Sequence, residues 1–213
     1  MPELPEVETV RRSLLPHLLG TRIGSVRIHR RDICECRDER NRRTAPTPDR
    51  LLTGDTISSI LRLGKQIAFI GESGRVVCVH LGMTGRLAVE ASAAPRPRNP
   101  HDHVVWSLPH IRSLTFHDPR RFGGIWTFPS EAALRSQRWS ALGPDALLLT
   151  GDHLASTLSS STRAVKAALL DQSVAAGVGN IYADEALFSA NIHPMTRCSR
   201  ISPSQWHTLA PEA

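Results

Sequence analysis

The distribution of apolar and polar residues divides the chain into two parts of different character. From Pro5 onward, apolar residues recur at the spacing of one helical face, and Gly20 supplies a stop. The residues of this face are Val7, Val10, Leu14, Leu15 and Leu18. This spacing predicts an amphipathic helix that anchors the first residues of the chain against a core.

Between this helix and residue 128, short apolar stretches alternate with turn signals such as GESGR and LPH. The stretches are TRIGSVRIHR, DTISSILRL, KQIAFI, RVVCVHL, HVVWSL and IRSLTF. Repeated short strands at close spacing predict an antiparallel β-sandwich, which with the helix forms an N-terminal domain over residues 1–128. One long segment of mixed charge, HRRDICECRDERNRRTAPTPDR, is predicted to be a solvated loop.

After Pro129 the pattern changes to helical spacing. Helical signals occur in PSEAALRSQRWSALG, GDHLASTLSS, TRAVKAALLDQSVA and YADEALFSA. They predict a second, helical domain over residues 129–213. The fold class predicted for the chain is therefore α+β.

Composition narrows the function classes. The chain has 213 residues, and its 26 Lys and Arg against 20 Asp and Glu, with a pI near 9.9, favour a polyanionic partner such as nucleic acid. No apolar run approaches the roughly 18 to 20 residues of a membrane span, and the first thirty residues lack a signal-peptide core. We therefore expect a cytoplasmic protein without a membrane partner. The four cysteines lack the paired C-x-x-C spacing of a structural zinc site, so no metal site is predicted.

Pro2 and Glu3 allow two interpretations. As residues at a helix start, they are ordinary, because proline's missing N–H costs nothing there and the helix dipole favours glutamate. If Met1 is removed, however, Pro2 carries a free secondary amine beside a carboxyl group. An α-amine titrates near pH 8 and a lysine near pH 10.4, so roughly a tenth of the former is free base at pH 7. Its attack on a sugar C1′ yields an iminium that labilises adjacent C–H bonds, with Glu3 as general acid and base.

Lys65 follows Gly64 at the mouth of the strand in RLGKQIAFI. A glycine turn can bring a lysine to a phosphate or to an active-site carboxylate, although most lysines at strand entries are solvated.

Two further motifs place large side chains beside glycines. Met83 lies in HLGMTGR, and Arg120 and Phe122 lie in HDPRRFGG. An unbranched apolar side chain at such a position can wedge into a base stack, arginine can bond base edges, and an aromatic ring can stack on bases. The alternative is that Met83 and Phe122 belong to the core.

The segment AAGVGNIYADEALF contains a turn between two helical stretches. Gly177 and Gly179 form this turn, and Asn180 is predicted to cap the second helix. A helix N-terminus at a glycine turn is a ready phosphate site, although many such helix pairs bind nothing.

Taken in order, these segments closely resemble the formamidopyrimidine-DNA glycosylase family of base-excision repair enzymes. The resemblance runs through PELPEVETVRR, LGK, HLGMTGR, HDHVVW, HDPRRFGG, LGPD and KAALLDQSVAAGVGNIYADEALFSANIHP, and it covers residues 2–194. It implies a helix-two-turn-helix arrangement in the second domain. It also implies a bifunctional enzyme that excises an oxidised purine and then cuts the strand by successive eliminations, acting as a monomer.

The resemblance implies roles for four residues of the candidate active site. Pro2 matches the family's nucleophile, Glu3 its proton donor and Lys65 the lysine that assists the lyase chemistry. Glu6 matches a buried supporting carboxylate.

The resemblance also implies an interface with double-stranded DNA that contains oxidised bases or abasic sites. Met83, Arg120 and Phe122 match the residues that fill the gap left by an extruded nucleotide, with Arg120 facing the orphaned base. The residues that match holders of the flanking phosphates are His101, Lys166 and Asn180.

The sequence departs from the family pattern after IHP. Family members continue with further helices, a lesion-capping loop and a finger of four cysteines holding zinc, and these motifs are not found in the 213 residues. We therefore expect no cofactor in this chain and a truncated helical domain. Two hypotheses follow: a working DNA glycosylase and lyase, or a damaged-DNA-binding remnant without turnover. A general basic nucleic-acid-binding domain would leave Pro2 and Glu3 unexplained.

Overall fold

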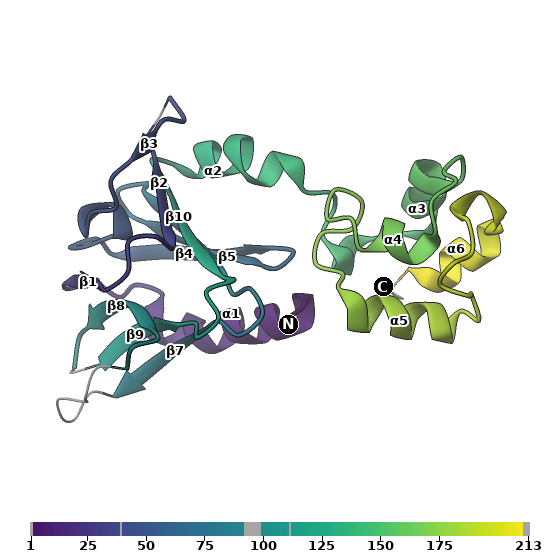
Figure 1. The fold of residues 1–213 in the computed structure, drawn as a ribbon. Coiled ribbons are helices and arrows are strands. Elements are labelled where there is room, and N and C mark those ends of the chain that lie inside the picture. The colour runs from purple at the N-terminus through teal and green to yellow at the C-terminus, as the bar shows by residue number, and fades with distance from the viewer. Residues whose placement is uncertain (1, 39, 92–98, 111, 211–213) are drawn as a thin grey trace. The chain divides into compact units, whose positions relative to one another are not determined.

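The computed structural model describes residues 2–38, 40–91, 99–110 and 112–210. The chain divides into two compact units, Met1–Trp139 and Ser140–Ala213 (Figure 1). The first unit contains helix, strands and a second short helix, and the other is helical, which confirms the α+β fold class.

Helix α1, Leu4–Leu18, begins the first unit and confirms the predicted N-terminal helix. Its start is stabilised by the carboxylate of Glu6, which accepts a hydrogen bond from the Glu3 amide at 2.9 Å, and by Pro5, whose missing N–H is no loss in the first turn. Its buried face packs against three strands, β4 (Ile57–Leu63), β5 (Gln66–Gly71) and β7 (Arg86–Ala91). The end of α1 is marked by Gly20 at a φ of +70°. The buried residues of α1 are Leu4, Val7, Leu14 and Leu18.

A four-stranded antiparallel sheet has the order β1-β8-β9-β7. Its strands are β1 Val26–Ile28, β7 Arg86–Ala91, β8 Asp102–Leu108 and β9 Arg112–His117.

A six-stranded sheet has the order β3-β2-β10-β6-β5-β4. Its strands are β2 Cys34–Arg37, β3 Arg43–Thr44, β4 Ile57–Leu63, β5 Gln66–Gly71, β6 Val76–His80 and β10 Gly124–Phe128. All neighbours are antiparallel except β2 and β10, which are parallel.

Strands β2 and β3 lie within the segment that we predicted to be a solvated loop, so that prediction is wrong for these residues. Cys34 and Cys36 point into the protein, while Glu35 between them pairs with Arg37 and Arg43 on the outer side. The strand is short, its inward residues are cysteines, and its pairing with β10 joins residues far apart in the chain. The pattern of charges along the segment does not indicate this pairing, so it could not predict the strand.

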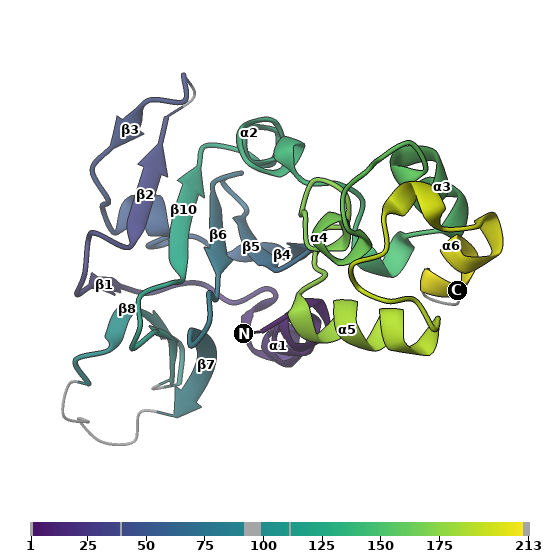
Figure 2. The same cartoon turned by 45° about the vertical axis from the view of Figure 1, so that its right-hand side comes forward.

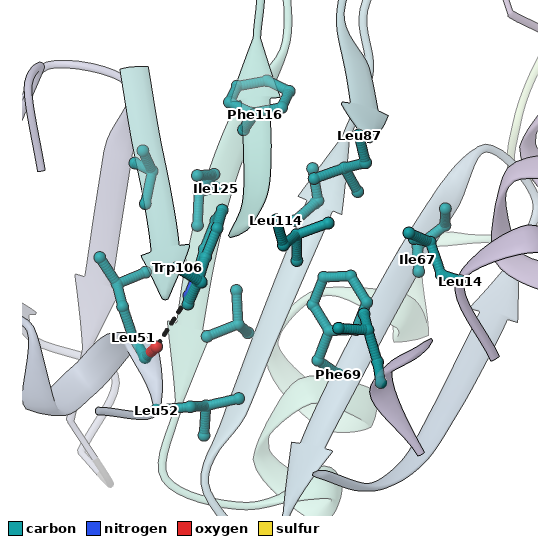
Figure 3. Close-up of a cluster of buried hydrophobic side chains, with 14 of the residues drawn as sticks. Leu14, Leu51, Leu52, Ile67, Phe69, Leu87, Trp106, Leu114, Phe116 and Ile125 are labelled. Atoms are coloured by element: carbon teal, nitrogen blue, oxygen red, sulfur yellow. Dashed lines mark hydrogen bonds between the residues drawn. The ribbon is translucent and has the colours of Figure 1, made fainter. Parts of the chain in front are cut away.

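Figure 2 shows the two sheets and α1 of this unit. Side chains from all three form one hydrophobic core, which is the packing expected of a sandwich (Figure 3). Trp106 from the smaller sheet is buried in it and donates its indole N–H to the carbonyl of Leu51 at 2.9 Å. Other labelled members of this core are Leu14, Leu52, Ile67, Phe69, Leu87, Leu114, Phe116 and Ile125.

Helix α2, Glu131–Gln137, packs against β6 and β10 and so belongs to the first unit. The side-chain oxygen of Gln66 accepts hydrogen bonds from Arg138 at 2.6 Å and from Trp139 at 3.3 Å, and the Arg138 guanidinium lies 3.4 Å from the centre of the Trp126 ring. These contacts tie the residues after α2 to the sheet. The division therefore falls at Trp139, whereas we expected it at residue 128.

The second unit contains four α-helices within its described residues. They are α3 Gly151–Leu158, α4 Val165–Leu169, α5 Asn180–Ser189 and α6 Pro203–Leu209. They enclose a separate core that includes Leu154, Val165, Ala183, Leu187 and Trp206.

The side chain of Gln172 bridges the turn that precedes α5. Gln172 donates to the carbonyls of Leu170 at 3.0 Å and Val178 at 2.9 Å, and it accepts from the amide of Gly177 at 3.0 Å. Gly177 has a φ of +111°, which is unfavourable for a residue with a Cβ. The predicted glycine turn is thus present.

Candidate active site and nucleic-acid interface

Glu3 is a buried carboxylic residue directly beside Pro2. Only 2% of Glu3 is exposed, and its backbone is extended immediately before α1 begins. Glu6, which we expected to be buried, is exposed, because the third position of α1 points away from the core. Its carboxylate holds the Glu3 amide from the outside, so Glu6 supports the start of the helix without being buried.

Lys65 lies in the turn between β4 and β5, where Gly64 adopts a φ of +54°. Only 8% of Lys65 is exposed, so the solvated alternative is wrong. Burial lowers the pKa of its ammonium group, and the negative charge of Glu3 acts in the opposite direction. The structure thus brings Lys65 within electrostatic reach of Glu3.

The turn that carries Lys65 is tied to α1. Arg62 donates one hydrogen bond to the Gly64 carbonyl at 3.2 Å and another to the Glu8 carboxylate of α1 at 2.9 Å. The ion pair between Arg62 and Glu8 therefore joins α1, whose N-cap is Glu3, to the turn that carries Lys65.

His80, which the sequence analysis did not single out, lies at the end of β6 near Lys65. Burial, together with the positive charges of Arg138 and Lys65, lowers the pKa of His80 to about 4, so the imidazole is neutral at pH 7. Its Nδ1 accepts the Gly82 amide at 3.1 Å. No local sequence signal identifies this histidine, because its environment comes from residues distant in the chain.

Met83 and Phe122 both protrude from the first unit. Their exposed fractions are 42% and 56%, so neither is a core residue. The guanidinium of Arg120 lies 4.8 Å from the centre of the Phe122 ring, which presents the two side chains together.

The loops that carry these side chains touch through glycines. A Cβ on Gly82, which has a φ of +63°, would lie 2.3 Å from the Gly123 nitrogen. Only glycine permits this approach. The structure therefore brings Met83, Arg120 and Phe122 to one place on the unit.

His101 is exposed in the turn before β8. Its ring lies edge-on to His117, with the ring centres 5.8 Å apart, and His117 bonds the Asp102 carboxylate at 2.7 Å. This places a cluster of imidazole groups at the end of the smaller sheet.

In the helical unit, Lys166 on α4 and Asn180 on α5 occupy neighbouring helices. The Lys166 ammonium lies 2.7 Å from the Asp184 carboxylate, so Lys166 is already paired. The prediction that Asn180 caps α5 is wrong: Gly179 is the N-cap, and Asn180 is the first helical residue and exposed. The extended backbone of Gly179 begins the helix one residue earlier than we expected.

Cys34, Cys36, Cys78 and Cys198 are buried as free thiols, and burial raises the pKa of Cys34 and Cys78 to about 12. In the part of the chain that the structure describes, no group of three or more His, Cys, Asp or Glu residues could hold a metal ion. Within the same ranges, the helices are too short or too polar to cross a membrane.

Comparison with known proteins gives the same assignment over both units. The family described as "Formamidopyrimidine-DNA glycosylase N-terminal domain" matches residues 1–125, and "Formamidopyrimidine-DNA glycosylase H2TH domain" matches residues 142–213. The chain belongs to the formamidopyrimidine-DNA glycosylase family. It is therefore a DNA glycosylase of base-excision repair.

Relatives support membership over nearly the whole chain. The formamidopyrimidine-DNA glycosylase of Xanthomonas axonopodis pv. citri is 41% identical over 99% of this chain and 74% of its own length. That of Roseobacter denitrificans is 37% identical over 99% of this chain and 75% of its own length. The Lactococcus lactis glycosylase, solved bound non-covalently to DNA with an abasic site, superposes with a TM-score of 0.83 at 31% identity, covering 98% of this chain and 77% of that one.

Proposed function

We propose that this member of the family excises oxidised purines from duplex DNA through an iminium on Pro2 and then cleaves the abasic strand. The observation that carries the proposal is the arrangement at the start of α1. The first residue that can offer a terminal amine is adjacent to a buried carboxylic residue, Glu3, and a buried lysine, Lys65, lies within its electrostatic reach.

The first step requires removal of Met1, because an amide nitrogen has no lone pair available for attack. The lone pair of the Pro2 amine then forms a bond to C1′ of the damaged nucleotide while the bond from C1′ to the base breaks, and the departing base takes a proton. The nitrogen then loses its proton and its lone pair forms the double bond to C1′ while the C1′–O4′ bond breaks, so that O4′ takes up a proton and the opened sugar carries the iminium. A secondary amine can form this cation directly, since it needs to lose only one proton.

The second step uses the iminium as an electron sink. A base removes a proton from C2′, and the electrons expel the 3′ phosphate; a second elimination expels the 5′ phosphate. Glu3 can accept and return these protons. Lys65, whose pKa is lowered by burial, is suited to proton transfer in the same place.

DNA recognition would divide between the two units. A base inside a duplex shields C1′, so the nucleotide must leave the stack, and Met83 and Phe122 would fill the resulting gap beside Arg120. His101, Lys166 and Asn180 would contact the phosphates on either side. Each phosphate contact adds affinity that weakens as salt increases.

Preference for purine lesions rests on relatives. MutM, 30% identical to this chain, was solved in complex with DNA containing carbocyclic 8-oxo-G. The Lactococcus lactis enzyme was solved with DNA containing an oxidised pyrimidine, so a test must include both classes. Since its substrate is chromosomal DNA, the enzyme would act in the cytoplasm of a bacterial cell.

Borohydride trapping tests the proposal. The chain is incubated with duplex DNA bearing 8-oxoguanine opposite cytosine, or an abasic site, and borohydride reduces any iminium to a stable cross-link. A version with an uncleaved peptide ahead of Pro2 is the matched control, since it keeps every side chain and removes only the free amine. Mass spectrometry confirms the N-terminus of each sample.

Cross-links on both duplexes that disappear with the blocked terminus would support the full proposal. Cross-links on the abasic duplex alone would limit the activity to strand cleavage. A folded sample that cross-links to neither duplex would overturn the proposal and favour a damaged-DNA-binding protein without turnover.

A further inference from the structure

The loops that carry Met83, Arg120 and Phe122 are joined by one buried carboxylate. Asp118 is fully buried. One of its oxygens accepts the hydroxyl of Thr84 at 2.6 Å, and the other accepts the amide of Gly123 at 2.7 Å. Asp118 thus bonds the residue after Met83 and the residue after Phe122.

The Thr84 hydroxyl makes a second bond to the opposite loop. Its oxygen accepts the amide of Arg120 at 3.3 Å while its single proton goes to Asp118. Thr84 on one loop is thus hydrogen-bonded to both Arg120 and Asp118 on the other loop. A side chain that can both donate and accept is required at position 84.

The backbone of Asp118 is fixed from a third element. His103, buried in β8, donates its Nε2–H to the Asp118 carbonyl at 2.7 Å. Because the Asp118 carbonyl and carboxylate are both engaged, a shift of either loop would break bonds inside the protein. Bonds to a buried charged group are the costly ones to lose.

This arrangement has a consequence for recognition. Exposed side chains on independent loops would lose conformational freedom on entering a base stack, which weakens binding. Loops bonded to a common buried group have already lost backbone freedom, so less is lost when their side chains enter the gap. The hydrogen bonds to Asp118 therefore favour binding most where Met83, Arg120 and Phe122 must enter the same gap together.

We propose that Thr84 and Asp118 are positioning residues that hold Met83, Arg120 and Phe122 as one preformed probe for a gap in the DNA stack. This inference rests on the proposed function, because it assumes that the three side chains enter such a gap. It assigns Thr84 and Asp118 to selectivity for damaged over intact DNA, and not to the chemistry at C1′.

Selectivity in binding tests the inference without requiring turnover. Fluorescence anisotropy measures the Kd of the chain for a duplex containing a tetrahydrofuran abasic analogue and for the intact duplex of the same sequence. Thr84→Val removes the hydroxyl at nearly constant shape, Thr84→Ser restores it, and Thr208→Val is the control, an exposed threonine on α6. Thr84 is itself exposed, so its substitution leaves the core packing intact.

We expect Thr84→Val to lower the ratio of affinity for the abasic duplex to affinity for the intact duplex by roughly threefold to tenfold, which is the effect of one hydrogen bond to a charged group. Thr84→Ser should restore this ratio. A loss of folded protein alone would reduce both affinities by the same factor and leave the ratio unchanged. Asp118→Asn, which keeps the shape but weakens the acceptors, should lower the ratio in the same direction.

The outcomes separate the two proposals. If the unsubstituted chain prefers the abasic duplex and Thr84→Val keeps that preference, the positioning role is overturned and the proposed function stands. If the unsubstituted chain binds both duplexes equally, gap recognition fails and the positioning role falls with it.

Discussion

Two ion-pair sites, one in each unit, hold their charged side chains differently. In the N-terminal unit, the Glu8 carboxylate accepts hydrogen bonds from Arg11, Arg12 and Arg62, and its side chain is only 14% exposed. In the helical unit, Lys166 pairs with Asp184, whose side chain is 57% exposed. A pair shielded from water fixes its partners, whereas an exposed pair is weak and easily exchanged.

This difference matches the work proposed for each unit. Chemistry at C1′ requires groups held in place before the substrate arrives. A phosphate clamp needs only a cation that can leave its carboxylate partner for a phosphate.

The largest effect is expected from Glu3→Gln, which keeps the shape of the side chain and removes its ability to transfer a proton. Loss of general acid–base catalysis should lower the rate of strand cleavage at an abasic site by roughly a hundredfold or more. Glu72→Gln, at an exposed carboxylate of the same unit, is the control. Single-turnover rates equal to those of the unsubstituted chain would remove Glu3 from the active site.

Glu8→Gln should destabilise the N-terminal unit in a pH-dependent manner. Hydrogen bonds from Arg11, which has the largest effect, and from Arg12 and Arg62 lower the pKa of Glu8 to about 2. In an unfolded chain the pKa of a glutamate is about 4.3. Its contribution is therefore fully present above about pH 5 and is lost as the pH falls toward about 2.

The expected loss at pH 7 is on the order of 2 kcal/mol, measured by urea unfolding followed by tryptophan fluorescence. The difference between Glu8→Gln and the unsubstituted chain should shrink as the pH is lowered toward 3. A difference that stays constant with pH would mean that the carboxylate charge adds nothing to the fixed pair.

Met83→Ala should lower affinity for an abasic duplex about tenfold while leaving affinity for intact duplex nearly unchanged, because a wedge acts only where a base has left the stack. Met195→Ala is a matched control, since Met195 is 70% exposed and lies in the other unit. Equal losses on both duplexes, measured by anisotropy, would argue against a wedge.

The smallest effects concern the exchangeable pair. Lys166→Ala should weaken binding to all duplexes by roughly fivefold and make the dependence of log Kd on log salt concentration shallower by about one unit. Asp184→Asn should do the opposite and strengthen binding modestly at low salt, since Lys166 no longer has to leave a carboxylate. A weaker complex from Asp184→Asn would show that the ion pair positions Lys166 instead of competing with DNA.

Sequence reasoning was most reliable where the cause of the structure is local. The face of α1 follows from helical spacing, and the glycines beside Met83 and Phe122 indicated turns that expose large side chains. It was wrong where contacts are distant. Strand β2 was missed because β10, one of its two pairing partners, follows it by most of the domain.

By itself, the sequence determined the family, the fold class, and which residues are candidates for chemistry and DNA contact, because motifs and periodicity are properties of neighbouring residues. Tertiary structure decided the burial of Lys65, the lowered pKa of His80 and the hydrogen bond between Thr84 and Asp118, which are 34 residues apart. Desolvation and hydrogen bonding depend on what the fold brings together. No spacing rule along the chain contains that information.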